Sequence, residues 1–303
     1  MKTQIKYLGK HWRKLFRDVV KTSIASFGVI ITFADALLNV LPEETTLHNL
    51  LYQLVHLPFD KPATILILIL ILVIVATIAN WPTTRAVYKD TNSDIKVLVE
   101  CCDLFQQQGM RVIHSVDTFD TALGTIISPN SVHGNFLKTC QENSFDIDQA
   151  IDNSLKNVAP ASEDENLPGR KLRYPLGTVC PVWIDSQQYV LVSFTHLNQG
   201  GNINITRKEY TDFLINMWRN LSTPIIRQDT INVAVMGNKF VDLPAEFSTE
   251  QKIDLMLQTF FMVQKEKSCC RTLRICVHES NMTEVDFSNY HTIIDHLAKR
   301  PII

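Results

Sequence analysis

An uninterrupted apolar run constrains this chain more than any other feature of its sequence. Residues 63–79 read ATILILILILVIVATIA and contain no charged residue, no glycine and no proline. As a helix with about 1.5 Å of rise per residue, this run and the two residues after it would span roughly 28 Å, close to the hydrocarbon core of a bilayer. The sequence therefore predicts a transmembrane helix over residues 63–81.

A second apolar stretch covers residues 22–41 and is interrupted by Asp35. A carboxylate in hydrocarbon is costly, and small residues such as Gly28 suit helix packing better than lipid contact. The stretch is therefore either a second span or a surface amphipathic helix, and we predict a span. Residues 22–81 would then form a transmembrane hairpin.

Basic residues predict the orientation of that hairpin. Seven Lys and Arg residues lie within residues 1–21, and residues 85–96 hold three more, whereas residues 42–62 hold one Lys against three acidic residues. Because positive segments stay on the cytoplasmic side, both termini are expected in the cytoplasm and the lipid bilayer is an expected partner.

The remaining chain, residues 95–303, alternates strand and helix patterns after a linker at 82–94. Capping boxes at 206–209 and 248–251 precede amphipathic helices, and a last helix is expected at 288–299. Alternation of this kind predicts a mixed sheet covered by helices on both faces in one α/β domain. Residues 157–170 hold two prolines and few apolar residues, so they are expected to form a mobile loop. The predicted strands are 95–100, 110–116, 178–184, 189–195, 231–236 and 272–278.

Several function classes lack support in the sequence. The seven cysteines form no Cys-x-x-Cys unit, so neither a disulfide framework nor a zinc site is indicated. Common nucleotide, protease and hydrolase motifs are absent. The chain has a net charge of −2, and its first 94 residues hold ten basic against seven acidic residues, which leaves the domain acidic. Nucleic acid is therefore not an expected partner.

Three loops that follow predicted strands combine small and polar residues. They are residues 101–105, 128–134 and 236–240. In open α/β sheets, ligands bind at the carboxyl ends of strands, and small residues ahead of a helix let backbone N–H groups meet an anion. Each loop alone is weak support, because most loops of this composition are only turns.

The order of these loops resembles the divergent macro-like domain of effector proteins in bacterial Thoeris anti-phage systems. The resemblance covers nearly the whole chain, since the family also carries two predicted transmembrane helices in front. It implies a macro-like mixed sheet sandwiched by helices. The matching runs are VECCDLFQ (99–106), SVDTFDTALGTIISPNSVHGNFL (115–137), RYPLGTVCPVWIDSQQYVLVSFTHLNQ (173–199) and INVAVMGNKFVDLP (231–244).

The resemblance assigns the site residue by residue. Asp103 matches the carboxylate that accepts the adenine amino group in macro domains, residues 130–134 match the first phosphate and ribose loop, and residues 237–240 match the second. The predicted ligand-binding residues are Asp103, Leu104, Phe105, Asn130, Ser131, Val132, His133, Gly134, His196, Gly237, Asn238, Lys239 and Phe240.

This chain departs from the family pattern at three places. NSVHG replaces a glycine-rich first loop, and Lys239 stands where a glycine is usual. The Asn that hydrolytic macro domains place near the distal ribose is replaced by the run Asp117–Asp120. No catalytic residue, no metal and no resident cofactor is therefore expected.

The resemblance implies a sensor rather than an enzyme. A TIR-domain partner would make a signal from NAD, and the macro-like domain would bind that ADP-ribose derivative, a histidine conjugate. The chain would then assemble with copies of itself at the bacterial inner membrane, disrupt the membrane and end the infection. The alternatives are a membrane-tethered hydrolase of ADP-ribose conjugates and a non-catalytic membrane scaffold.

Overall fold

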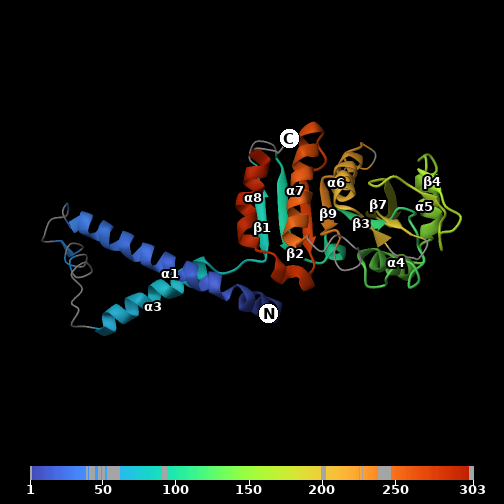
Figure 1. The fold of residues 1–303 in the computed structure, drawn as a ribbon. Coiled ribbons are helices and arrows are strands. Elements are labelled where there is room, and N and C mark those ends of the chain that lie inside the picture. The colour runs from blue at the N-terminus through green and yellow to red at the C-terminus, as the bar shows by residue number, and fades with distance from the viewer. Residues whose placement is uncertain are drawn as a thin grey trace. The chain divides into compact units, whose positions relative to one another are not determined.

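The protein divides into two compact units, Met1–Thr83 and Thr84–Ile303. The computed structural model describes residues 2–38, 62–90, 94–198, 203–224, 228–237 and 247–299, together with positions 40, 45, 46, 49, 52 and 226. The first unit is described through two helices, and the second through a sheet with helices on both faces (Figure 1).

The two helices of the first unit pack against each other. They are α1 (Lys2–Leu38) and α3 (Pro62–Ala79). Asn80, directly after α3, donates to the Oγ1 atom of Thr22 at 3.1 Å and to the carbonyl of Ala76 at 2.8 Å. Ala76 and Val19 are buried, whereas other apolar side chains of the pair, Ile78 among them, stay exposed.

The predicted membrane hairpin is not borne out. Among the residues that the structure describes, no helix is both long enough and apolar enough to cross a bilayer. In α1, residues 22–38 belong to one continuous helix with the basic residues that precede them. The predictions of two spans and of an inner-membrane location are therefore corrected.

The second unit is built on one mixed sheet. Its strand order is β1-β2-β10-β9-β3-β7-β6, and β8 pairs with β7. The five central strands run parallel to one another, as at Leu273–Val97 and Val112–Val190, whereas β1, β6 and β8 each pair antiparallel with one of them. The strands are β1 (Arg85–Lys89), β2 (Lys96–Cys101), β3 (Met110–Val116), β6 (Val179–Ile184), β7 (Gln187–Leu197), β8 (Ile203–Asn204), β9 (Thr230–Ala234) and β10 (Thr272–Val277).

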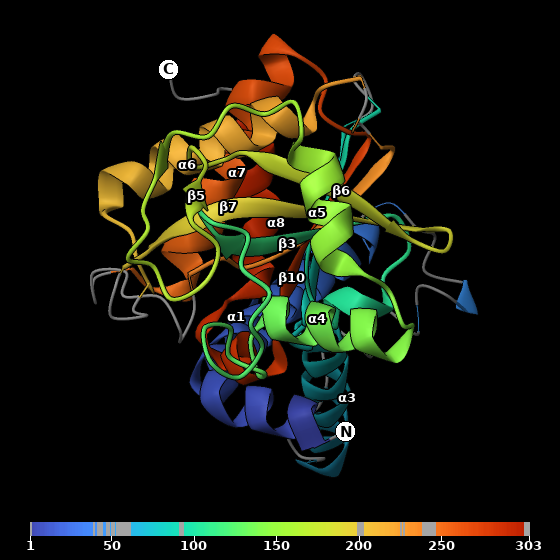
Figure 2. The same cartoon turned by 90° about the vertical axis from the view of Figure 1, so that its right-hand side faces the viewer.

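Helices cover both faces of this sheet, as the sequence predicted (Figure 2). On one face lie α6 (Arg207–Leu221), α7 (Thr249–Glu266) and α8 (Phe287–Lys299). On the other lie α4 (Val132–Glu142) and α5 (Ile147–Leu155). Both predicted capping boxes are present, on α6 and α7. Side chains of β7 alternate between the two faces of the sheet and pack against the helices on each. Tyr189 packs on Phe136 of α4 with 5.0 Å between ring centroids, and Phe194 packs on Phe213 of α6 with 4.7 Å.

Two elements lie where the sequence predicted a linker and a mobile loop. The edge strand β1 falls inside the predicted linker at 82–94, because its Ala86 is fully buried against the sheet while its ends are charged and exposed. Within the predicted loop at 157–170, Ser162–Glu163 forms a short strand, β4, which pairs with β5 (Leu172–Arg173). Short 3₁₀ helices, η1 (Leu104–Gln106) and η2 (Glu279–Glu284), complete the unit.

Candidate functional site

The predicted site residues lie along the sheet edge that is formed by the carboxyl ends of the parallel strands. Because β2, β10, β9, β3 and β7 are parallel, their carboxyl ends meet at the same edge. Asp103 follows β2, Gly237 follows β9, the loop with Ser131 follows β3, and His196 lies near the end of β7. Neighbouring strands are about 4.8 Å apart, so this edge runs for about 19 Å from β2 to β7. The predicted residues Asn238, Lys239 and Phe240 lie outside the described part of the chain.

Asp103 occupies the first position along this edge. Its Oδ1 atom accepts a hydrogen bond from the Phe105 amide at 2.9 Å, so the side chain caps η1. Leu104 is buried beneath it and Phe105 packs against the same core. The carboxylate itself is exposed and can accept further hydrogen bonds from a ligand.

The amino end of α4 forms the second part of the edge. Ser131 caps the helix: its Oγ atom accepts from the Gly134 amide at 2.9 Å and donates to the carbonyl of Ser128 at 2.7 Å. A Cβ atom on Gly134 would lie 2.1 Å from that carbonyl oxygen, so only glycine allows this close approach. Asn130 is exposed and Val132 is half-buried. The helix dipole and the amides of the first turn make such an end attractive to anions.

His133, in the first turn of α4, is buried and polar. Its side chain is 3% exposed, and neither ring nitrogen has a hydrogen-bond partner among the described residues. Burial, with a further effect of His114, lowers the pKa of His133 to about 3, and burial lowers the pKa of His114 to about 4. Both rings are therefore neutral at pH 7. His133 can offer one donor and one acceptor to an uncharged group, but no charge to a phosphate.

A buried carboxylate that the site prediction did not include organises the ends of β3 and β7. Asp117 is 1% exposed. Its Oδ2 atom lies 2.7 Å from Nη1 of Arg173 and 2.9 Å from Nδ1 of His196, and its Oδ1 atom accepts from the Leu197 amide at 3.1 Å. The hydrogen bond to Asp117 raises the pKa of His196, whose Nε2 atom is 3.8 Å from a carboxylate oxygen of Glu209.

Asp120 performs a similar task three residues later. It accepts from the Ala122 amide at 2.9 Å and from the Arg170 amide at 2.8 Å. A Cβ atom on Gly169 would lie 1.6 Å from an Asp120 oxygen, so the chain passes very close here. Asp117 and Asp120 thus anchor Arg173 and Arg170 to the sheet edge, so the predicted mobile loop at 157–170 is held at its last residue. The signal in the sequence was the pair of carboxylates directly after a buried strand.

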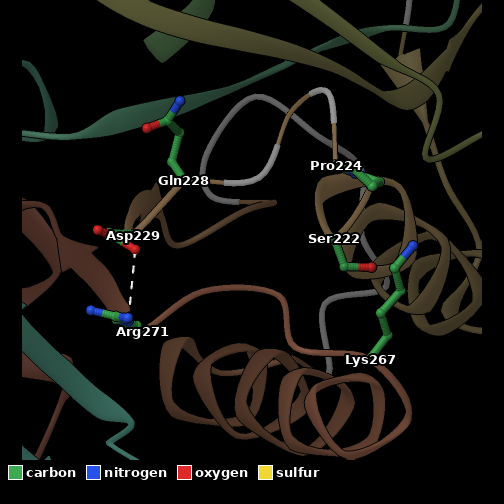
Figure 3. Close-up of a pocket in the computed structure, with 6 residues that line it drawn as sticks. All are labelled: Ser222, Pro224, Gln228, Asp229, Lys267 and Arg271. Carbon is green, nitrogen blue, oxygen red and sulfur yellow. Dashed lines mark ion pairs between the residues drawn. The ribbon is translucent and has the colours of Figure 1, made fainter.

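One pocket in the described part of the chain lies at the amino ends of the parallel strands, opposite the predicted site; Figure 3 shows the residues that line it. It has a volume of about 470 Å³ and is found where β9 and β10 begin, next to the carboxyl ends of α6 and α7. Nε of Arg271 is 3.8 Å from Oδ1 of Asp229 there. No predicted site residue belongs to this pocket. Its lining residues are Ser222, Pro224, Gln228, Asp229, Lys267 and Arg271.

The described residues provide no ligand set for a metal ion. They contain no group of three or more His, Cys, Asp or Glu side chains arranged to hold an ion. All seven cysteines are free thiols, five of them buried.

Sequence and structure comparisons place the second unit among known proteins. The family model described as "Thoeris protein ThsA, Macro domain" matches residues 97–278. Two solved structures of the Oceanobacillus iheyensis macrodomain, one with ADP and one with MES bound, align at 16% and 17% identity. Each covers 71% of this chain and 98% of its own, with a TM-score of 0.42. These scores are low, so the assignment rests on the family model. No curated protein matches the sequence significantly.

Proposed function

Because this chain belongs to the family of Thoeris ThsA macro domains, we propose that it is an anti-phage effector that binds an ADP-ribose-derived signal. The signal is made by a TIR-domain partner and is a histidine conjugate of ADP-ribose. Binding changes how copies of the chain associate, because a ligand shifts an assembly only through its different affinity for the two states.

One observation carries this proposal: four chemically distinct groups share a single sheet edge. The exposed Asp103 carboxylate accepts the adenine amino group, and the amino end of α4 with the exit of β9 flanks the diphosphate. His196 lies at the end of the edge left for the distal ribose and its substituent, and His133 lies in the first turn of α4. The arrangement matches a ligand with a base at one end, two phosphates at the middle and hydroxyl groups at the other end.

A second candidate function is hydrolysis of an ADP-ribose conjugate, and one contact favours it. Asp117 binds Nδ1 of His196 and leaves the other side of the imidazole toward solvent. The His196 side chain is 41% exposed. A histidine held in this way can act as a general acid or base. Arg173 also pairs with the Asp117 carboxylate, and Glu209 lies near Nε2 of His196. Because both groups already have charged partners, we favour binding without turnover.

Incubation of the full chain with ADP-ribose and with its histidine conjugate separates the candidates. The protein is then separated from free ligand, and both fractions are analysed by chromatography with mass spectrometry. The sensor retains unchanged ligand in the protein fraction. Conversion of the ligand to ADP-ribose and a released amino acid would instead identify a hydrolase, and ligand recovered only in the free fraction would refute both functions.

A further inference from the structure

Two buried side chains hold consecutive carbonyl groups where the chain leaves β9. The hydroxyl of Tyr210, on α6, donates to the carbonyl of Met236 at 3.3 Å. The Nζ atom of Lys252, on α7, donates to the carbonyl of Gly237 at 2.7 Å. These two contacts come from different helices, so they fix the direction of the backbone at this point.

The backbone here has a conformation that few residues adopt. Gly237 has φ of +80°, in the left-handed region where a side chain would be strained. Because the peptide is planar and trans, the N–H of Gly237 points away from the Met236 carbonyl that Tyr210 holds. The turn therefore depends on a glycine and on the two donors that hold its carbonyls.

Lys252 is an unusual choice for a structural donor. It is 8% exposed, and burial lowers the pKa of its ammonium below the ordinary value, while Glu284 acts in the opposite direction. The Glu284 carboxylate also accepts from the Thr249 hydroxyl and from Asn281. A neutral amide could donate to the same carbonyl at lower desolvation cost, so a buried cation here indicates a need for positive charge.

We propose that Lys252 is a positioning residue of the diphosphate subsite, which holds the turn at Gly237 and places a positive charge behind the phosphates. This inference rests on the proposed function, since the turn lies on the sheet edge assigned to the ligand. Lys252 acts through the backbone and through its field. It therefore favours a nucleoside diphosphate over a nucleoside.

Calorimetric titration of the full chain with ADP-ribose and with adenosine tests this role. Lys252→Met is expected to weaken ADP-ribose binding by about tenfold, equal to about 1.4 kcal/mol, and adenosine binding by less than about twofold. Lys265→Met, an exposed position on the same helix, should change neither affinity. Equal loss for both ligands, or no loss for ADP-ribose, would overturn the proposal.

Two further measurements remain informative if the methionine variant folds poorly. In the parent protein, affinity for ADP-ribose should fall as pH rises toward the ordinary lysine pKa of about 10.4, because the pKa of Lys252 is lowered and its charge is lost before that pH. Among the described residues, Tyr210 and Glu284 are the other titratable groups at this position, and burial raises the pKa of Tyr210. Lys252→Gln keeps a donor without charge and should abolish this pH dependence. A dependence that persists in Lys252→Gln overturns the inference, whereas a parent that binds neither ligand refutes the proposed function itself.

Discussion

Nδ1 of His196 lies 2.9 Å from Oδ2 of Asp117, and this contact joins the carboxyl ends of the neighbouring parallel strands β7 and β3. Arg173 reaches the same carboxylate from β5, and it also donates to the carbonyl of Leu197 at 2.6 Å. The sheet edge and the segment that contains β4 and β5 are therefore held together by one buried charge.

Removal of that charge should destabilise the second unit. Asp117→Asn leaves Arg173 without its buried partner, and breaking a buried ion pair costs about 3–5 kcal/mol. Urea unfolding, followed by circular dichroism, measures the change. Asp229→Asn is the matched control, because Asp229 is 83% exposed and its ion pair with Arg271 is 3.8 Å long, so its unfolding midpoint should stay unchanged. Equal midpoints for the two variants would contradict the role of Asp117.

Acidification should reduce stability through the two buried neutral histidines. The pKa of His133 is about 3 and that of His114 about 4 in the folded protein, against an unfolded value of about 6.5. The unfolded chain therefore binds more protons below pH 6.5, and each histidine lowers the unfolding free energy by about 1.4 kcal/mol per pH unit until its folded pKa is reached. Urea titrations at several pH values measure the slope.

His196 contributes with the opposite sign. Its pKa is raised in the folded protein, so its stabilising effect is complete below the unfolded pKa and is lost as pH rises through the folded one. His196→Gln should therefore remove a gain of stability as pH falls toward about 6.5 and leave the slope below that pH unchanged, whereas His133→Leu should make the slope below about 6.5 shallower. Parallel slopes in the two variants would show that these rings do not titrate as described.

His133 should reveal a conflict between stability and binding. Its two ring nitrogens are buried and have no hydrogen-bond partner in the part of the chain that the structure describes, and leaving a buried polar group unsatisfied costs about 1–3 kcal/mol. At pH 7, His133→Leu should therefore raise the unfolding free energy while weakening the affinity for ADP-ribose. Thermal unfolding and calorimetry of the same variant measure both effects. A variant that loses stability and keeps full affinity would assign His133 to the structure alone.

The close approach of Gly169 to Asp120 predicts a change in the mobility of residues 157–170. Gly169→Ala would place a methyl group against the carboxylate that holds the Arg170 amide. We expect faster proteolytic cleavage of this segment in the variant than in the parent. Gly28→Ala has open space around its added methyl group and serves as the control. Unchanged cleavage in Gly169→Ala would show that Asp120 does not anchor the segment.

The sequence predicted local features of the fold more successfully than long-range contacts. The bounds of β3 and both capping boxes match, because strand alternation and helix capping depend on residues close in the chain. The Asp117–Arg173 and Lys252–Gly237 contacts depend on how distant segments pack, which no local pattern reports. The sequence analysis did not predict α5, although Ile147, Ile151 and Leu155 recur at helical spacing after the N-cap residue Asp146. The prediction of two membrane spans was wrong, because no helix in the described part of the chain is both long enough and apolar enough to cross a bilayer.

The central claim is that the edge of the sheet at Asp103 binds an ADP-ribose derivative. Titration calorimetry of the full chain with ADP-ribose and its histidine conjugate tests it most directly, with Asp103→Ala as the variant and circular dichroism as the check of folding. The account predicts saturable binding that Asp103→Ala weakens by about tenfold, equal to about 1.4 kcal/mol. No heat of binding with either ligand, or equal affinity in the folded variant, would contradict it.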